Sequence, residues 1–162
     1  MILVICTGNV FRSPLAEAYL RQLLKKSQFD SAEVLSAGLY AQHGIKPVDI
    51  AIKLAQADNL DISEHDSQPL SPELLSKSKI ILVMEKFHKS FIENIYPDAA
   101  GITYLLGSYS KVKKKNNPDI IDPYGADFAT CKQVWEQIKE CLENFVDTSL
   151  DLHMLYGTEL EL

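Results

Sequence analysis

A cysteine and an arginine stand near the start of the chain, in the segment Cys6-Thr7-Gly8-Asn9-Val10-Phe11-Arg12-Ser13-Pro14. A cysteine thiolate is a strong nucleophile, and an arginine guanidinium presents a planar fork that matches two oxygens of a phosphate group. Ser13 is a natural N-cap and Pro14 fits the first helical position, so we expect a helix to begin here. These residue types and their spacing indicate nucleophilic attack on a phosphate ester.

The start of that helix is expected to form an anion-binding site. Its free backbone N–H groups and the positive end of the helix dipole attract a phosphate. Gly8 and Asn9 tolerate a left-handed backbone and would let the loop curl until its amides converge. Cys6 would face these groups, which favours its thiolate form. With Arg12, this assembly suits phosphoryl transfer without a metal or another cofactor.

The Cys-x5-Arg spacing is weak evidence by itself, because a cysteine at a strand end is more often a small buried hydrophobic residue. The context strengthens it. An apolar run at residues 2–5 predicts a buried strand, and the turn, arginine, serine and proline then follow in the order that the chemistry requires. We therefore predict that Cys6 is a nucleophile.

A general acid is also needed, because an alkoxide or phenolate leaving group has to take up a proton. The candidate is Asp122, in the segment Ile120-Ile121-Asp122-Pro123-Tyr124-Gly125. Pro123 cannot donate to a sheet and stiffens a turn, which favours a loop that presents the carboxylate. An Asp-Pro pair alone is an ordinary turn, so its role depends on the loop at Cys6.

Alternating strands and helices are expected to position these residues. Apolar runs predict strands at residues 2–5, 33–37, 79–84 and 102–106, and helical spacing predicts helices at 15–26, 47–57, 86–95 and 127–146, with a shorter one after Ser71-Pro72. Residues 107–122 are polar and are predicted to form a surface loop. Strands separated by helices pair in parallel, and such sheets bind ligands beyond the carboxyl ends of their strands. Cys6 lies at such an end.

The last predicted helix carries an apolar stripe formed by Phe128, Cys131, Trp135, Ile138, Leu142 and Phe145. Its two cysteines, Cys131 and Cys141, are about 15 Å apart along a helix axis and cannot bridge each other. Packing is their expected role. We expect Cys131 to be buried away from the strand end that carries Cys6.

Composition limits the class of protein. The 162 residues are 46% hydrophobic and carry a net charge of −6, which fits one globular domain and argues against a general nucleic-acid or membrane-surface binder. The basic run at residues 111–115 is expected to be a solvated loop. The N-terminal apolar run is too short for a signal peptide or a membrane insertion, and three cysteines suit a reducing compartment. A cytoplasmic location is expected.

These motifs resemble the low-molecular-weight protein tyrosine phosphatases. That family has a Cys-x5-Arg-Ser-Pro loop near its N-terminus and an Asp-Pro-Tyr turn near its C-terminus, here residues 6–14 and 122–124. The segments 36–38, 62–68 and 82–84 are also similar, and the likeness covers about residues 1–147. It implies a single open four-stranded parallel sheet flanked by helices, a flavodoxin-like three-layer sandwich. Residues 148–162 would be an extension of unknown role.

The resemblance implies a two-step reaction on a phosphotyrosine-containing protein, with inorganic phosphate as the product. Cys6 attacks phosphorus while Asp122 protonates the leaving oxygen, and a water that Asp122 deprotonates then hydrolyses the cysteinyl-phosphate. Phosphate would be held by Arg12 and by the loop amides of the residues Thr7, Gly8, Asn9, Val10, Phe11 and Arg12.

The resemblance also implies supporting roles. Ser13 would hydrogen-bond the Cys6 sulfur, and the loop would be braced by Asn9, Ser36 and His65. Tyr124 and Tyr40 would line the walls of the cleft. One departure concerns redox protection, because many members have a second cysteine where this chain has Phe11. A disulfide by that route is lost here, and Phe11 is expected to add an apolar contact near the mouth of the site.

Three alternative functions have to be compared with phosphotyrosine hydrolysis. Arsenate reduction on the same fold needs resolving thiols after the third strand, and residues 84–90 contain no cysteine. Phosphoarginine phosphatases resemble this chain but place Thr at Val10 and Phe at Tyr124; an apolar residue at 10 suits a phenyl ring better. A binding module without catalysis would lack the nucleophile, the arginine or the acid, and all three residues are present.

Overall fold

The computed structural model describes residues 1–27, 31–111 and 117–148. Within them, one parallel sheet has the strand order β2-β1-β3-β4, formed by β1 Ile2–Cys6, β2 Val34–Gly38, β3 Ile80–Val83 and β4 Thr103–Leu105. The register pairs Cys6 with Gly38 and Ile5 with Val83. The carboxyl ends of the strands therefore meet at one edge, and the predicted open parallel sheet is confirmed.

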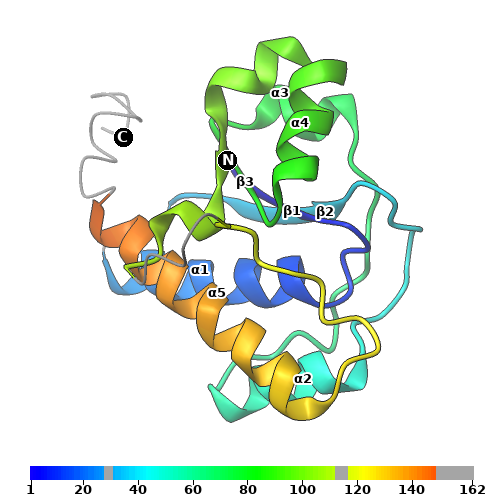
Figure 1. Ribbon diagram of the computed structural model, residues 1–162, viewed down its shortest axis with the longest axis vertical. Coiled ribbons are helices and arrows are strands. Elements are labelled where there is room, and N and C mark those ends of the chain that lie inside the picture. Colours follow the sequence, from blue (N-terminus) through cyan, green and yellow to red (C-terminus); the bar gives the residue numbers. More distant parts are fainter. Residues whose placement is uncertain (28–30, 112–116, 149–162) are drawn as a thin grey trace.

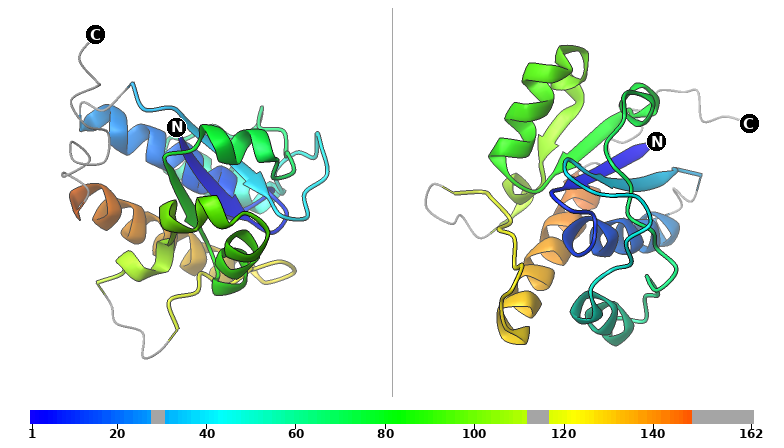
Figure 2. Two further views of the ribbon diagram at one scale, coloured as in Figure 1. Left: turned by 90° about the horizontal axis from the view of Figure 1, so that it is seen from above. Right: turned by 90° about the vertical axis from the view of Figure 1, so that its right-hand side faces the viewer.

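Helices cover both faces of this sheet. They are α1 Arg12–Lys26, α2 Asp49–Ala57, α3 Pro72–Lys77, α4 Lys86–Ile95 and α5 Phe128–Thr148, with short 3₁₀ turns η1 Pro97–Ile102 and η2 Leu106–Tyr109. In Figure 1, α1 and α5 lie on one side of the strands and α3 and α4 on the other, and the turned views in Figure 2 show the same three layers. This is the predicted three-layer sandwich.

Strand β1 is central, and all five of its residues are buried. A continuous apolar run is typical of a parallel strand covered on both faces. Alternate residues enter two cores: Ile2, Val4 and Cys6 pack toward α1 and α5, whereas Leu3 and Ile5 pack toward α3 and α4. The alternation sets the side on which the Cys6 side chain lies.

The predicted stripe of α5 is confirmed except at its start. Cys131, Trp135 and Ile138 are buried, as are Leu142 and Phe145. Phe128 is 51% exposed, so its predicted burial is wrong. Helical spacing gives the side of a helix on which a residue lies, but not whether another element covers its first turn.

The predicted surface loop at residues 107–122 is partly wrong. Gly107 is buried in η2, and Ile120 is fully buried in the core. The Ile120 N–H donates to the Met84 carbonyl at 2.8 Å, which ties this segment to the end of β3. The basic residues Lys113–Lys115 and nearly all of the extension 148–162 lie outside the described residues. In the described part, no helix is both long and apolar enough to cross a membrane.

Candidate active site

The segment between β1 and α1 places the cysteine sulfur at a helix N-terminus. The Cys6 side chain is 2% exposed, and its Sγ accepts the Asn9 backbone N–H at 3.2 Å. The hydroxyl oxygen of Ser13 lies 2.9 Å from the same sulfur. Donors at the positive end of a helix stabilise a thiolate relative to a thiol.

Ser13 does not cap α1, so that prediction is wrong. The helix begins at Arg12 with Phe11 at the N-cap position, and Ser13 lies inside the first turn. Its oxygen is 2.9 Å from the Cys6 sulfur and accepts a hydrogen bond of 2.9 Å from Asn9 Nδ2. The contact between Ser13 and Cys6 implied by the resemblance is present.

Asn9 holds the curled loop in shape. Its φ is 56°, in the left-handed region that asparagine tolerates. Its Nδ2 donates to Ser13 and to Ser36 Oγ, both at 2.9 Å, and its Oδ1 accepts the Gln68 N–H at 2.9 Å. His65 Nε2 lies 3.2 Å from the Asn9 carbonyl oxygen. The structure therefore brings the three predicted bracing residues, Asn9, Ser36 and His65, together.

Two further features of this loop differ from expectation or were not foreseen. Gly8 has no positive φ, so the predicted left-handed conformation is wrong for Gly8 and right for Asn9. Glu17 is buried on α1, accepts a short hydrogen bond from Ser36 Oγ and lies 4.0 Å from His65 Nδ1. No spacing in the sequence indicates Glu17, because its partners Ser36 and His65 lie on other segments of the chain.

Gly38 allows β2 to pack directly against the loop. A Cβ at this position would lie 2.6 Å from the Thr7 carbonyl oxygen and 3.0 Å from the Asn9 nitrogen. Both atoms belong to backbone that cannot move without disturbing the loop. We expect Gly38→Ala to lower the free energy of unfolding by about 1–3 kcal/mol, as overpacking does, and to reduce turnover with it.

Urea unfolding of Gly38→Ala measures that loss. The matched control is Gly101→Ala, because a Cβ on Gly101 would have no neighbour within 4 Å. A Gly38→Ala protein as stable and as active as Gly101→Ala would contradict the close approach.

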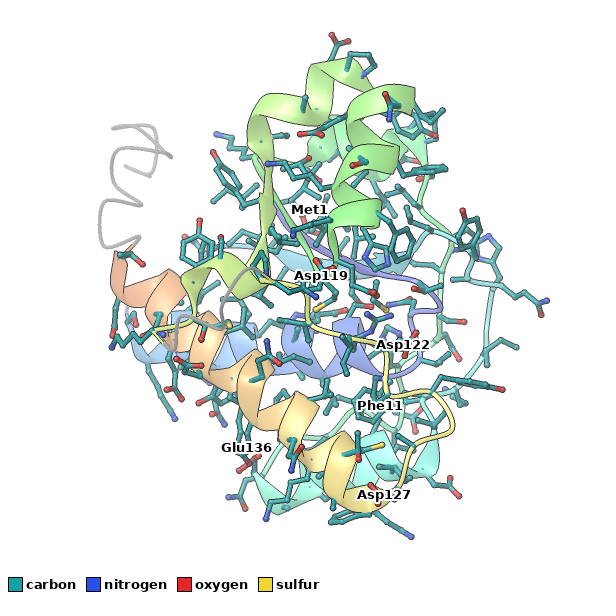
Figure 3. All side chains as sticks on the ribbon, viewed as in Figure 1. Met1, Phe11, Asp119, Asp122, Asp127 and Glu136 are labelled. Atoms are coloured by element: carbon teal, nitrogen blue, oxygen red, sulfur yellow. The ribbon has the colours of Figure 1, made fainter. Side chains whose placement is uncertain are left out.

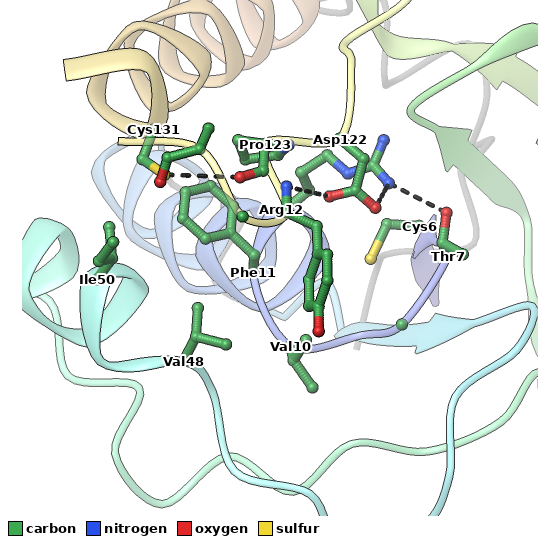
Figure 4. A pocket seen from close by; sticks show the side chains of 14 residues that line it. Cys6, Thr7, Val10, Phe11, Arg12, Val48, Ile50, Asp122, Pro123 and Cys131 are labelled. Carbon is green, nitrogen blue, oxygen red and sulfur yellow. Dashed lines mark hydrogen bonds and ion pairs between the residues drawn. The ribbon is translucent and has the colours of Figure 1, made fainter. Parts of the chain in front are cut away.

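Arg12 connects both sides of the site. Its side chain is 1% exposed. Nη1 donates to the Ile120 carbonyl at 2.9 Å and forms a short ion pair with Glu85 Oε1. Nη2 donates to Thr7 Oγ1 at 3.1 Å and to Asp122 Oδ2 at 2.6 Å. These contacts hold the guanidinium beside the loop, and Figure 4 shows it between Asp122 and Thr7.

Asp122 lies on a segment that is fixed at several points. Arg12 bonds the carbonyl of Ile120, and Asp119 Oδ1 accepts the Lys86 N–H at the start of α4 at 2.8 Å. Asp122 Oδ1 accepts the Tyr124 N–H at 3.3 Å. The Asp122 side chain is 40% exposed, so solvent reaches the carboxylate. The chain thus presents Asp122 to the same pocket that Cys6 lines.

Glu85 and His88, at the start of α4, were missed in the sequence. Besides its ion pair with Arg12, Glu85 shares a capping box with His88, whose Nδ1 accepts the Glu85 N–H at 3.0 Å. His88 Nε2 lies 3.1 Å from Thr7 Oγ1. Burial, together with the positive charge of Arg12, lowers the pKa of His88 to about 3. The Glu-x-x-His spacing at a predicted helix start was the available signal.

A pocket of about 630 Å³ joins these residues. Its phosphate end and its apolar wall are formed by Cys6, Thr7, Gly8, Val10, Phe11, Arg12, Val48, Ile50, Asp122, Pro123, Tyr124, Gly125, Ala126 and Cys131. Figure 3 shows Phe11 and Asp122 on the same side of the molecule, and Figure 4 shows the pocket between them and α2. Most of the lining away from the loop is apolar.

The positions of three residues, Tyr124, Tyr40 and Cys131, can be compared with this pocket. Tyr124 lines it and is 88% exposed, so its ring is open to solvent. Tyr40 is not among the lining residues; it packs edge-on against Phe91, with ring centroids 6.4 Å apart. Cys131 is buried, as predicted, and it lines the same pocket as Cys6; Figure 4 shows the two cysteines at opposite ends of the lining. The helix α5 begins next to the pocket, which its periodicity could not reveal.

This arrangement can perform phosphoester chemistry without further groups. The Cys6 sulfur accepts a backbone N–H, and the Arg12 guanidinium and the Asp122 carboxylate, which are paired with each other, line the same pocket. Fixed donors of this kind stabilise negative charge on a transferring phosphoryl group. The carboxylate can exchange a proton with a leaving oxygen or with water.

Comparison with known proteins also indicates a phosphatase. The family model described as low molecular weight phosphotyrosine protein phosphatase matches residues 1–154. The chain is 34% identical over 145 residues to a probable low molecular weight protein-tyrosine-phosphatase EpsP of Ralstonia nicotianae, covering 90% of this chain and 92% of that protein. It is 28% identical over 141 residues to a protein-arginine-phosphatase of Bacillus subtilis, covering 87% and 91%. The crystal structure of the Erwinia amylovora tyrosine phosphatase AmsI matches with a TM-score of 0.79 and 30% identity, covering 91% of each chain.

Proposed function

The chain belongs to the low molecular weight phosphotyrosine protein phosphatase family, and on that premise we propose that it hydrolyses phosphotyrosine in proteins through a cysteinyl-phosphate on Cys6. The relatives include both tyrosine and arginine phosphatases. The choice between these substrates therefore has to rest on the pocket of this chain.

The observation that carries the proposal is the apolar wall beside the phosphate loop. Its side chains come from the loop, from α2 and from α5, and include Val10, Phe11, Val48, Ile50 and Cys131. A phenyl ring gains free energy when it leaves water for such a wall. A guanidinium group loses hydrogen bonds to water there unless acceptors replace them. Asp122 is the one carboxylate among the lining residues, and it is already paired with Arg12.

The first step of the proposed reaction transfers the phosphoryl group to sulfur. The Cys6 thiolate attacks phosphorus, an S–P bond forms, and the P–O bond to the tyrosine ring breaks. Asp122 gives its proton to the leaving phenolate oxygen. Arg12 and the loop amides bind the phosphoryl oxygens, on which negative charge must be stabilised. A phosphate on the loop competes with Asp122 for Arg12 Nη2.

The second step returns the enzyme to its starting form. A water gives a proton to Asp122 and attacks phosphorus, and the S–P bond breaks. Inorganic phosphate leaves and the Cys6 thiolate is restored. In this scheme Ser13 stabilises the thiolate through its hydroxyl, whereas Asn9, Ser36 and His65 keep the loop curled. Tyr124 would flank the substrate ring at the open side of the pocket.

The substrate choice is tested with two peptides of one sequence that carry either phosphotyrosine or phosphoarginine. We expect the wild-type protein to prefer phosphotyrosine, and Val10→Thr to lower that preference in kcat/KM by roughly 10-fold, because a hydroxyl replaces a methyl group on the apolar wall. Val10→Ala is the control, since it removes apolar surface without adding a polar group. A wild-type preference for the phosphoarginine peptide would refute the proposal.

A further inference from the structure

His88 is buried close to the site but takes no part in the reaction described above. Its side chain is 0% exposed, and the ring of Phe87 packs on it with the centroids 3.9 Å apart. Each of its two ring nitrogens makes one polar contact. Nδ1 lies 3.0 Å from the Glu85 nitrogen, and Nε2 lies 3.1 Å from Thr7 Oγ1.

The two contacts fix which ring nitrogen carries the proton. A backbone N–H can only donate, so Nδ1 must accept and carries no hydrogen. The ring is neutral at working pH, because burial and Arg12 lower the pKa of His88 to about 3. The hydrogen of the neutral ring is therefore on Nε2, which donates to Thr7 Oγ1.

The Thr7 hydroxyl oxygen receives a second donor from Arg12 Nη2, at 3.1 Å. A hydroxyl has two acceptor lone pairs and one hydrogen, so the two donors occupy both lone pairs. The hydrogen of the Thr7 hydroxyl can therefore donate only to a third group, neither His88 nor Arg12. Thr7 lines the same pocket as Cys6, and a phosphoryl oxygen bound there would be a strong acceptor for this hydrogen.

From this geometry we propose that His88 is a positioning residue that turns the Thr7 hydroxyl into a hydrogen-bond donor toward the transferring phosphoryl group. The inference rests on the proposed phosphatase reaction and adds one side-chain donor to the amides and Arg12. Because the same oxygen accepts from Arg12, His88 also helps to hold the guanidinium next to the loop.

A purely structural role for His88 makes a different prediction. The capping box of α4 uses only Nδ1, whereas the contact with Thr7 uses only Nε2. In His88→Asn, the side-chain oxygen can take the place of Nδ1 and keep the cap, but the side chain is too short to reach Thr7. In His88→Gln, the terminal amide can reach the position of Nε2 and donate from there.

The test is turnover of p-nitrophenyl phosphate by these variants. We expect Thr7→Val and His88→Asn each to lower kcat by roughly 100- to 1,000-fold, as loss of one fixed donor does, and His88→Gln to recover most of that loss. The double variant Thr7→Val/His88→Asn should be no slower than Thr7→Val alone. Both changes remove the same interaction, the hydrogen bond from the Thr7 hydroxyl to the phosphoryl group. Additive losses, or a His88→Gln protein slower than His88→Asn, would overturn the proposal.

A second measurement does not depend on activity. The ¹⁵N chemical shifts of the imidazole rings, with His88 assigned by comparison with His88→Gln, report the tautomer directly. We expect the proton of His88 on Nε2 at every pH from about 5 to 8. A proton on Nδ1, or a charged ring in that range, would disprove the inference even if the protein is an active phosphatase. A wild-type protein that turns over no aryl phosphate would instead count against the proposed function, and the tautomer would still decide the hydrogen bonding of His88.

Discussion

Replacing Cys6 by serine is expected to lower kcat for p-nitrophenyl phosphate by at least roughly 10⁴-fold, because removal of a nucleophile disables the whole catalytic unit. A serine hydroxyl at this position stays protonated near neutral pH and attacks phosphorus slowly. Binding of inorganic phosphate is expected to persist in Cys6→Ser. It depends on the loop amides and on Arg12, which the substitution leaves in place.

Cys131→Ser is the matched control for that variant. It makes the same atomic change on the wall of the same pocket, where the sulfur lies 3.8 Å from the carbonyl oxygens of Pro123 and Ala126. We expect Cys131→Ser to retain most of the activity. If Cys6→Ser kept turnover comparable to that of Cys131→Ser, Cys6 would not be the nucleophile.

Replacing Asp122 by asparagine is expected to slow hydrolysis of phenyl phosphates by on the order of 10²- to 10⁴-fold, the usual size of general acid catalysis. Asparagine keeps an oxygen for the Tyr124 N–H, so the turn should be preserved, but it cannot supply a proton. The loss should shrink as the leaving phenol becomes more acidic, because an acidic phenolate needs no proton. A series of substituted phenyl phosphates measures this dependence.

Asp119→Asn provides the comparison for Asp122. Asp119 lies on the same segment but accepts the Lys86 N–H, away from the leaving oxygen. We expect the loss of activity of Asp119→Asn relative to the wild-type protein to be small and nearly the same for every leaving group. An equal loss across leaving groups of very different acidity in Asp122→Asn would indicate that Asp122 acts only through its ion pair with Arg12.

The parts of the site that could be predicted from sequence depend on short stretches of chain. The order of strand, cysteine, turn, arginine and helix lies within β1 and the start of α1, and local rules apply there. Asp122 could be identified because Pro123 restricts the backbone beside it. The parallel sheet followed from the alternation of apolar runs with helical patterns.

The parts that could not be predicted depend on contacts between distant segments. His88 and Thr7 are 81 residues apart in the chain, and Glu85 and Arg12 are 73 apart. Nothing in either segment indicates the partner. Ser13 is a different case, because its partners Cys6 and Asn9 lie only seven and four residues away, and its hydroxyl contacts them instead of capping α1. The curled loop between β1 and α1 replaced the capping preference of serine there.

Helical periodicity had a related limit on α5. It predicted the buried side correctly from Cys131 to Phe145, but not what lies opposite each residue. Phe128 faces that side but is 51% exposed, and Cys131 packs in the core while it also lines the pocket. Only the packing of α5 against the loops decides between these outcomes.

The central claim is that the phosphoryl group passes through Cys6. It is tested most directly by acid quench of the Asp122→Asn protein within the first turnover of p-nitrophenyl phosphate, followed by intact mass and peptide mapping. The acidic leaving group lets the first step proceed, and loss of the base slows hydrolysis of the intermediate. The account predicts a burst of nitrophenol and one added phosphoryl group on the peptide that contains Cys6. A burst with the phosphoryl group on any other residue, or steady turnover with no phosphorylated protein at any time, would contradict it.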